Sequence, residues 1–552
     1  MTHPRHVSSR RHILGLAVGW AAPNLPIWAA TASAVDDNAV SALNYGVDPT
    51  GQKDSTDAFN AALANTMLNG KPSNAGRVLH IPRGVYLVSG TLKLGSGQRV
   101  VFEPGVRIDA TGLPNEATSL FIAAGQKGVE MTGNGAELIG GRGRANKEVE
   151  GSQAAIYIYG SSDVVVQDFR IRDFATDGIY VGGESGGKKP SSNVRIESCE
   201  VLNCRRNGLS IVSCDGCVVV GGVYAGSAGA PHGPWAGIDV EPNANQQVTG
   251  IKLMNVRTQD NTGSGLLFVP GSSSSQPGAR FDVEVVGGES RNDGSLTSLP
   301  AVNFACGGLM TNTVAGQVAL RKFQVISPKS SGVSFYNWDA DKAPLALLED
   351  VSVVDPDGTA NAHSNETRTG FLIYCDKRQV VQALGNIRLV RCRAEDSRTK
   401  PRMVRGGILA VDPGKSIRKV SVIDFMSKNA LSNPKPGFST AASNVPGGLV
   451  DTTIEYTKQD PVDLETNVSL YELGGRSVRA TRPQLRFSLP LAANCRGLTM
   501  LVSAAPGVQG TTIAVDGADR LRGATSGEGK ELVVHPGQSV KLKSDGNSWV
   551  EQ

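Results

Sequence analysis

Four segments in the middle of the chain repeat one pattern: Asp177-Gly-Ile-Tyr-Val-Gly182, Asn207-Gly-Leu-Ser-Ile-Val212, Ala236-Gly-Ile-Asp-Val-Glu241 and Ser264-Gly-Leu-Leu-Phe-Val269. Each has glycine in second place, and these glycines are 30, 29 and 28 residues apart. Self-similarity at a period of about 20–50 residues is typical of repeat architectures. The chain is therefore expected to form a solenoid.

A short run rich in β-branched and aliphatic residues precedes each segment: Val164-Val-Val-Gln167, Val194-Arg-Ile-Glu197, Val218-Val-Val220 and Ile251-Lys-Leu253. Alternation with period two is typical of a half-buried strand. Glycine and asparagine at the corners are expected to supply the left-handed conformations of tight turns. Strands and turns in rounds of about 28 residues predict an all-β chain folded as a parallel β-helix, with coils stacked about 4.8 Å apart.

Composition excludes several classes of protein. The 55 Lys and Arg residues nearly balance the 51 Asp and Glu residues, whereas a nucleic-acid-binding protein would carry a strong basic excess or stripe. Hydrophobic residues make up 40 % of the chain, which argues against disorder. No apolar stretch long enough to span a membrane follows the N-terminal segment.

The N-terminal 34 residues are typical of an export signal. Arg10 and Arg11 directly precede an apolar run that ends in Ala32-Ser-Ala34, a small-residue cleavage pattern. Paired arginines in this position indicate the twin-arginine route, and an ordinary secretory signal is the alternative. We expect a periplasmic or secreted protein, with residues 1–34 excluded from the fold.

The remaining chain divides into a β-helix domain over 35–432, a Pro/Gly/Ser-rich linker over 433–449 and a C-terminal β module over 450–552. A helix over 54–68, with Ser55 or Thr56 as N-cap, is expected to cap the solenoid. Asp545-Gly546 predicts a hairpin in the module. The module either closes the solenoid with Trp549 in its core, binds sugar through Trp549, or joins chains into an oligomer.

Eight cysteines are too few for a disulfide-dense scaffold. Cys214 and Cys217 form a single CxxC with no second pair to complete a zinc site. Buried thiols are the leading interpretation, and one disulfide is the alternative.

The region after residue 40 resembles a known group. Asn44-Tyr-Gly-Val-Asp-Pro-Thr-Gly51, Asp54-Ser-Thr-Asp-Ala-Phe59 and Val78-Leu-His-Ile-Pro-Arg-Gly-Val-Tyr-Leu-Val-Ser-Gly90 are similar to the start of the pectate-lyase-like superfamily. That resemblance implies a right-handed parallel β-helix and a polysaccharide-active protein, such as a polygalacturonase-type hydrolase, a polysaccharide lyase or a phage tailspike. It does not choose among their reactions.

The third repeat offers a candidate catalytic pair. Alternation points Ile238 and Val240 inward, so Asp239 and Glu241 are expected outside the core. Two positions along a strand are about 6.8 Å apart, which suits two carboxylates that act on one sugar, since inverting glycosidases separate theirs by about 6.5–9.5 Å. Solvated surface charges are the alternative interpretation of this pair.

Six further residues are candidates for binding substrate. Neighbouring coils are expected to supply an outward tyrosine, a guanidinium that can hold a uronate, a corner amide, a corner histidine, an aromatic platform and an outward amide: Tyr180, Arg206, Asn207, His232, Trp235 and Asn243. For His232 and Trp235 the alternative is a role in packing the corner. Asn207, like Asp177, is also a typical turn residue.

These residues favour an exported polysaccharide hydrolase with Asp239 and Glu241 as catalytic groups. The alternatives are a lyase or C5-epimerase acting on a uronic-acid polymer, and a non-catalytic glycan-binding or surface-assembly protein. The Asn-Thr-Asp, Asp-Asp and Gly-His-Gly motifs of polygalacturonase-like hydrolases do not occur in the coils. A hydrolase would need no cofactor and a lyase could use a calcium ion, although the scattered Asp residues predict no metal site.

Overall fold

The computed structural model describes most of the chain from residue 39 onward. The described residues are 39–67, 77–114, 119–142, 153–184, 189–230, 232–295, 299–357, 368–431, 438–440, 448–455, 462–464, 468–469, 477–489, 491–492, 495–515, 519–523 and 527–552. The expected export signal lies outside these residues.

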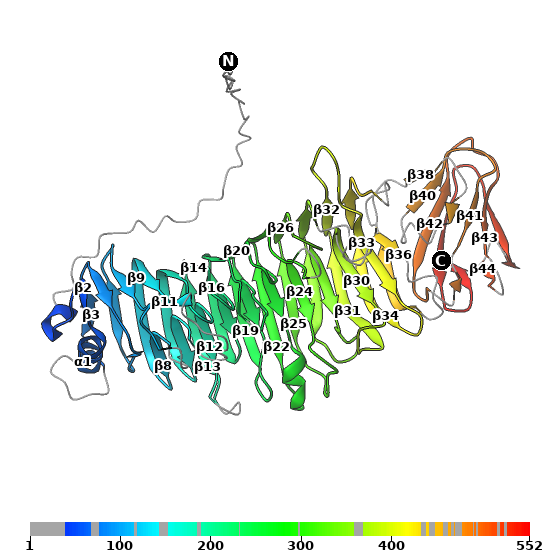
Figure 1. The fold of residues 1–552 in the computed structure, drawn as a ribbon. Helices are drawn as coiled ribbons and strands as arrows, with labels where there is room; N and C mark the ends of the chain where they lie inside the picture. The colour runs from blue at the N-terminus through cyan, green and yellow to red at the C-terminus, as the bar shows by residue number, and fades with distance from the viewer. Residues whose placement is uncertain are drawn as a thin grey trace, which may run out of the picture.

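The chain is an all-β solenoid of parallel strands, as the repeats predict (Figure 1). One side is a 12-stranded sheet, to which each coil adds one strand. Its strands are β5 (Leu92–Lys93), β8 (Phe121–Ala124), β10 (Ile156–Tyr159), β12 (Ile179–Gly182), β15 (Leu209–Ile211), β18 (Ile238–Val240), β21 (Leu266–Phe268), β24 (Val302–Ala305), β27 (Val333–Tyr336), β30 (Thr369–Cys375), β33 (Arg405–Val411) and β36 (Phe438–Thr440).

A 25-stranded sheet forms the rest of the wall in two columns. The first contains β1 (Val40–Ser41), β3 (Val78–Ile81), β6 (Arg99–Phe102), β13 (Ser191–Glu197), β16 (Cys214–Val220), β19 (Val248–Met254), β22 (Phe281–Val286), β25 (Gln317–Arg321), β28 (Leu345–Glu349), β31 (Ala383–Val390), β34 (Ser416–Ile423) and β37 (Leu449–Glu455). The second contains β2 (Thr50–Asp54), β4 (Val85–Leu87), β7 (Arg107–Asp109), β14 (Glu200–Leu202), β17 (Val223–Ala225), β20 (Arg257–Gln259), β23 (Glu289–Arg291), β26 (Gln324–Ile326), β29 (Ser352–Val354), β32 (Arg393–Glu395) and β35 (Met426–Lys428). The long strands β9 (Lys127–Ile139) and β11 (Ser162–Arg172) pair in both columns.

Glycine is needed at the four repeat positions for a reason other than the one expected from the sequence. None of them adopts a positive φ. A Cβ on Gly208 would lie 2.6 Å from the carbonyl oxygen of Gly237, and one on Gly178 would lie 2.8 Å from that of Gly208. The glycines therefore allow neighbouring coils to approach closely. Left-handed turns at the corners are made elsewhere, for example by Asp173 and Asn203.

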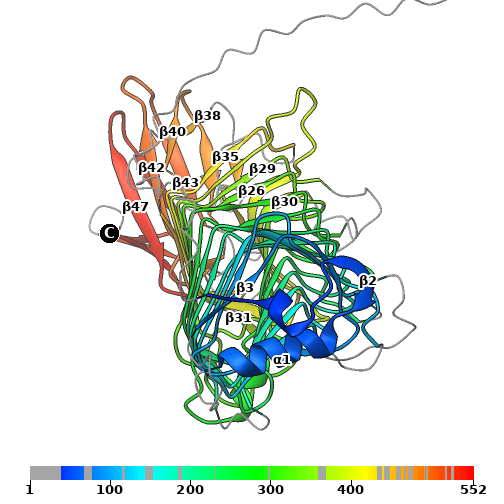
Figure 2. The ribbon, with the colours of Figure 1, turned by 90° about the vertical axis from the view of Figure 1, so that its left-hand side faces the viewer.

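An α-helix and a short 3-10 helix precede the first full coils. Helix α1 runs from Thr56 to Thr66, inside the predicted 54–68, and Figure 2 shows it lying across the end of the solenoid. Ser55 occupies the N-cap position, but its hydroxyl accepts the N–H of Asp48 rather than a helix N–H. Asp54 Oδ1 accepts the N–H of Thr56 instead, at 3.0 Å. The 3-10 helix η1 spans Ala42–Tyr45.

The far end of the solenoid carries a small β module (Figure 1). Its two sheets contain β38 (Val462–Leu464), β40 (Ser477–Ala480), β42 (Thr499–Ala504), β44 (Leu521–Gly523), β45 (Gly527–Gly529), β47 (Ser539–Ser544) and β48 (Trp549–Glu551), and β39 (Val468–Ser469), β41 (Arg486–Ser488), β43 (Thr511–Ala514) and β46 (Glu531–Val534). Solenoid pairing continues through β37, so the parallel ladder reaches Glu455 rather than stopping at residue 432.

The predicted hairpin at Asp545-Gly546 joins antiparallel β47 and β48. Trp549 is fully buried, so it belongs to the core of the module and offers no surface to a sugar. One hydrophobic core runs from the cap to Trp549.

All eight cysteines are buried and free, which agrees with the leading interpretation rather than with a disulfide. Among the described residues, no helix is long and apolar enough to cross a membrane.

Candidate functional site

Side chains at the centre of successive strands in the 12-stranded sheet form an outward ladder. Tyr157, Tyr180, Ser210, Asp239 and Leu267 are register partners on β10, β12, β15, β18 and β21. This order is the one that the repeat spacing predicts from Tyr180 onward. Polar groups therefore occupy two adjacent rungs, with tyrosines on one side and Leu267 on the other.

Asp239 is buried, contrary to the expected solvated position outside the core. Its residue is 1 % exposed, although its side chain points away from the coil interior between Ile238 and Val240. Oδ2 accepts a hydrogen bond from the amide of Asn207 at 3.1 Å, whereas Oδ1 is buried and has no hydrogen-bond partner among the described residues. Corner segments of neighbouring coils lie outside this sheet, so strand alternation alone does not determine exposure.

Asn207 is a positioning residue. It is fully buried, and the contacts described for its side chain are with protein groups. Its amide nitrogen donates to Ser210 Oγ and Asp239 Oδ2, while its amide oxygen accepts the N–H of Ala236. Two neighbouring coils are thus joined through one side chain, and the Asp239 carboxyl is held in place.

Asp177 contacts the same group of side chains, although the sequence indicates a turn residue at this position. Its Oδ1 accepts the N–H of Asn207 at 3.1 Å, and its Oδ2 accepts the hydroxyl of Ser210 at 3.0 Å. Arg206 Nη1 lies 3.7 Å from Oδ2. We call Asp177, Asp239, Glu241 and Arg206 the acidic cluster. The signal for Asp177 was available, because it is the register neighbour of Asn207 one coil earlier.

The acidic cluster places three carboxyl groups around one guanidinium. Burial raises the pKa of Asp239 well above its usual value, the neighbouring Glu241 raises it further, and Arg206 opposes the shift. Burial also raises the pKa of Glu241 and of Asp177, again opposed by Arg206. One positive charge does not compensate three buried negative ones, so the cluster retains protons at a higher pH than free carboxyls do.

Glu241 and Asn243 leave the strand. β18 ends at Val240, and the N–H of Glu241 donates to Ile211 O at 3.2 Å. Glu241 is half-buried and remains beside Asp239. Asn243 is exposed in the turn beyond Pro242, which corrects its expected place along the same strand.

The corner before β18 contains His232 and Trp235. His232 is exposed, and Trp235 is half-buried. The indole N–H of Trp235 donates to Ala230 O at 2.9 Å, and its ring packs over Gly233. These contacts match a role in packing the corner. Arg206 Nε approaches Gly233 O at 3.5 Å, which connects this corner with the acidic cluster.

Two tyrosines absent from the predicted site extend the ladder. The rings of Tyr157 and Tyr180 stack with centroids 4.7 Å apart and an angle of 8°, and Tyr159 stacks on Tyr157 at 5.8 Å. All three are half-buried, so part of the stack faces solvent. The alternation Ile156-Tyr-Ile-Tyr159 could have revealed this platform from the sequence.

The same face is hollowed further along the solenoid. Cavities of about 310 and 160 Å³ adjoin at Leu372 and Tyr374. Asn303 and Tyr336 also line the larger one, and the hydroxyl of Tyr374 donates to Asp412 at 2.8 Å. In the part of the chain that the structure describes, no group of three or more His, Cys, Asp or Glu side chains is arranged to hold a metal ion.

Comparison with known families supports the architecture directly. A family model described as the right-handed β-helix region matches residues 92–230. The solenoid is a right-handed parallel β-helix. The matched part of this β-helix includes Asp177, Arg206 and Asn207.

Two curated relatives of the β-helix come from Bacillus subtilis (strain 168). The uncharacterized protein YclG is 29 % identical over 247 residues, which cover 40 % of this chain and 41 % of that protein. The SPbeta prophage-derived uncharacterized protein YorA is 22 % identical over 214 residues, covering 34 % and 35 %. The chain thus spans about two fifths or less of the curated relatives that it matches.

Several solved structures align with this chain at low sequence identity. A family 28 exopolygalacturonase from Yersinia enterocolitica aligns with a TM-score of 0.47 and 11 % identity, over 77 % of this chain and 79 % of that one. A GH87 α-1,3-glucanase from Streptomyces thermodiastaticus gives 0.43 and 12 %, over 77 % and 68 %. The N-terminal fragment of bacteriophage Phi29 gene product 12 gives 0.39 and 14 %, over 87 % of each.

Proposed function

We propose that the protein is an exported polysaccharide-processing enzyme that hydrolyses glycosidic bonds at the acidic cluster. The observation that carries the proposal is the buried, unpartnered Oδ1 of Asp239 beside Glu241. Buried polar atoms in native structures nearly always have a partner, and exceptions gather at functional sites. Export places the enzyme in the periplasm or outside the cell, and the C-terminal module is available for oligomerisation.

A second buried carboxyl shows what a structural aspartate looks like in this fold. Asp293 Oδ1 accepts the backbone N–H and the side-chain amide of Asn261. Its Oδ2 accepts the hydroxyls of Thr258 and Ser290. Four partners satisfy this carboxyl, whereas Asp239 has one, and the contrast favours a chemical role for Asp239.

The proposed division of roles follows from burial. Asp239, the more deeply buried group, keeps its proton and acts as general acid toward the leaving oxygen. Glu241 is nearer to solvent and, when ionised, takes the proton of the attacking water. Among the described residues, the polar contacts of the Arg206 side chain are long, at 3.5 and 3.7 Å. In this proposal Arg206 moves as sugar binds, which opens Asp239 Oδ1 to the substrate.

Turnover of the mature protein on a panel of bacterial and plant polysaccharides tests the proposal. Reducing ends without unsaturated uronates are expected for the wild type. Asp239→Asn and Glu241→Gln should each lower turnover by about 10²–10⁴-fold, as loss of a general acid or base does. Asp293→Asn is the matched control: it alters a buried carboxyl far along the chain and should leave turnover near the wild-type level.

Other outcomes would replace this function. Unsaturated uronates would identify a lyase, with Arg206 neutralising the uronate carboxylate. Near-full activity in both carboxamide variants, with Tyr180→Phe or His232→Ala inactive, would move the chemistry to proton abstraction. Polymer binding without either product would identify a glycan-binding or assembly protein.

A further inference from the structure

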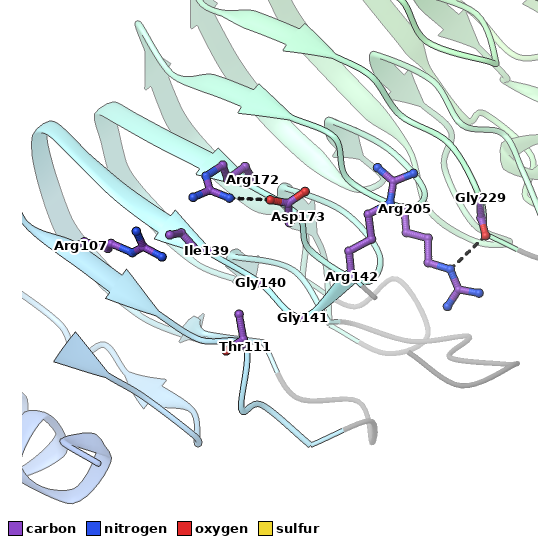
Figure 3. Close-up of a pocket in the computed structure, with 10 residues that line it drawn as sticks. All are labelled: Arg107, Thr111, Ile139, Gly140, Gly141, Arg142, Arg172, Asp173, Arg205 and Gly229. Atoms are coloured by element: carbon purple, nitrogen blue, oxygen red, sulfur yellow. Dashed lines mark hydrogen bonds and ion pairs between the residues drawn. The ribbon is translucent and has the colours of Figure 1, made fainter. Parts of the chain in front are cut away.

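A cavity of about 640 Å³ lies at the corner where strands β7, β9, β11 and β14 end (Figure 3). Four arginines line it from four successive coils: Arg107, Arg142, Arg172 and Arg205. Asp173 is the one acidic residue among the ten lining residues, and Asp109 and Glu137 approach the arginines from outside the lining. A volume of this size falls within the range of ligand sites.

Two consecutive glycines leave this corner without side chains. A Cβ on Gly140 would lie 2.7 Å from Asp173 O, and one on Gly141 would lie 2.9 Å from Thr111 O. Any other residue would therefore force the corner apart. The surrounding coils place long arginine side chains around this bare stretch of backbone.

Two of the four arginines donate hydrogen bonds to neutral carbonyl oxygens. Both terminal nitrogens of Arg142 donate to carbonyl oxygens, of Asn203 at 2.6 Å and of Ala228 at 2.7 Å. Arg205 Nε donates to Gly229 O at 2.9 Å (Figure 3). The two Arg142 contacts fix its guanidinium group in place, and because both acceptors are neutral its positive charge stays in the pocket.

Carboxylates contact the other two arginines of the pocket. Arg172 contacts Glu137 at 3.3 Å and Asp173 at 2.7 Å. Arg107 lies 3.8 Å from Asp109, and its side chain is 44 % exposed. Arg107 therefore stands at the rim, where it can meet a ligand without first leaving a close ion pair.

We propose that this pocket binds an anionic substituent of the polysaccharide, either a uronate carboxylate or a sulfate ester. Guanidinium groups bind planar and tetrahedral oxyanions with two parallel hydrogen bonds, and fixed guanidinium groups do so at little entropic cost. A neutral sugar would offer no charge to Arg142, which donates to neutral carbonyl oxygens, or to Arg107, whose nearest carboxylate is 3.8 Å away. The inference rests on the proposed function, because it selects the class of polymer that the acidic cluster processes.

The backbone connects the pocket with the acidic cluster. Arg205 lines the pocket and the next residue, Arg206, reaches Asp177 at 3.7 Å. The backbone N–H groups of both arginines donate to carbonyl oxygens of the preceding coil, those of Phe174 and Thr176. Adjacent residues of one corner, Arg205 and Arg206, thus line the pocket and belong to the acidic cluster respectively.

Binding measurements on the full mature protein test the inference. The wild type should bind polygalacturonate or a sulfated galactan more tightly than dextran, with affinity falling as salt rises. Preference for one of the two anionic polymers identifies the carboxylate or the sulfate source. Arg107→Gln and Arg142→Gln should each weaken the preferred interaction by about tenfold or more, as expected for loss of a charge-assisted hydrogen bond.

Arg170→Gln is the matched control, because Arg170 belongs to the same strand as Arg172, is 62 % exposed and pairs with Glu200 outside the pocket. The Arg107→Gln variant distinguishes a loss of binding from a folding defect, since Arg142 joins coils and Arg107 does not. Equal affinity for dextran, or unchanged binding in both pocket variants, would overturn the inference. Glu241→Gln separates the two proposals: it should abolish turnover and keep the binding of anionic polymer.

Discussion

Asp239 occupies a position that lowers the stability of the fold at high pH. The pKa of its carboxyl is raised in the folded chain, chiefly by burial, so the folded state binds more protons than the unfolded state above about pH 4. Stability contributed by the protonated form is present below the unfolded pKa and is lost as pH rises through the folded pKa. A group retained under these conditions is more readily explained by function than by folding.

Asp239→Asn removes this titration. The free energy of unfolding of the variant should therefore increase relative to that of the wild type as pH rises from about 4 to 7. The increase is up to about 1.4 kcal/mol for each pH unit below the folded pKa. Urea unfolding at several pH values measures the difference.

Asp48→Asn provides a control of opposite sign. Hydrogen bonds from Thr50, followed by the N–H groups of Lys53 and Gln52, lower the pKa of Asp48 to about 2. Its contribution is complete about one unit above the usual Asp pKa and is lost as pH falls toward 2, so its effect should be constant between about pH 5 and 7. A constant difference for Asp239→Asn over the same window would contradict the proposed protonation.

At the scale of the element, the repeat glycines determine how closely coils stack. Gly208→Ala would bring a Cβ within 2.6 Å of Gly237 O and 3.1 Å of the Tyr224 side chain, with backbone on one side that cannot rotate away. Overpacking of this kind costs about 1–3 kcal/mol, which should appear as a lower thermal midpoint.

Gly307→Ala is the control for that experiment. Gly307 has no positive φ, and nothing lies within 4 Å of the Cβ that it would acquire. The thermal midpoint of the Gly307→Ala variant should match that of the wild type. If Gly208→Ala is equally silent, close approach of the coils is not the reason for the glycine at this position.

The repeat period predicted the strands and their register, because each coil must place the same apolar faces inward. The partners Tyr180, Ser210, Asp239 and Leu267 follow from that period alone. Burial of Asp239 and Asn207 could not be predicted in this way, because it depends on corners whose lengths differ between coils. The arginine pocket likewise needs three-dimensional neighbours from coils about 30 residues apart, whereas the alternation at Ile156–Tyr159 did carry a signal for the stacked tyrosines.

At the scale of the whole molecule, the N-terminal arginine pair predicts the route of export. Replacement of Arg10 and Arg11 with lysines should leave the precursor in the cytoplasm if the twin-arginine route carries it. Fractionation followed by immunoblotting measures the distribution. Unchanged delivery to the periplasm would indicate the general secretory route, and a reporter fused to the general signal serves as the control for intact secretion.

The cysteines have a consequence for where the chain can mature. All eight are buried as thiols, and burial raises the pKa of Cys199 and Cys204 to about 12, so thiolates, the species that oxidants attack, are scarce. The native covalent structure consequently needs no oxidant and no disulfide isomerase. We therefore expect the same folded state in a reducing cytosol as in an oxidising envelope, as the predicted twin-arginine route would require.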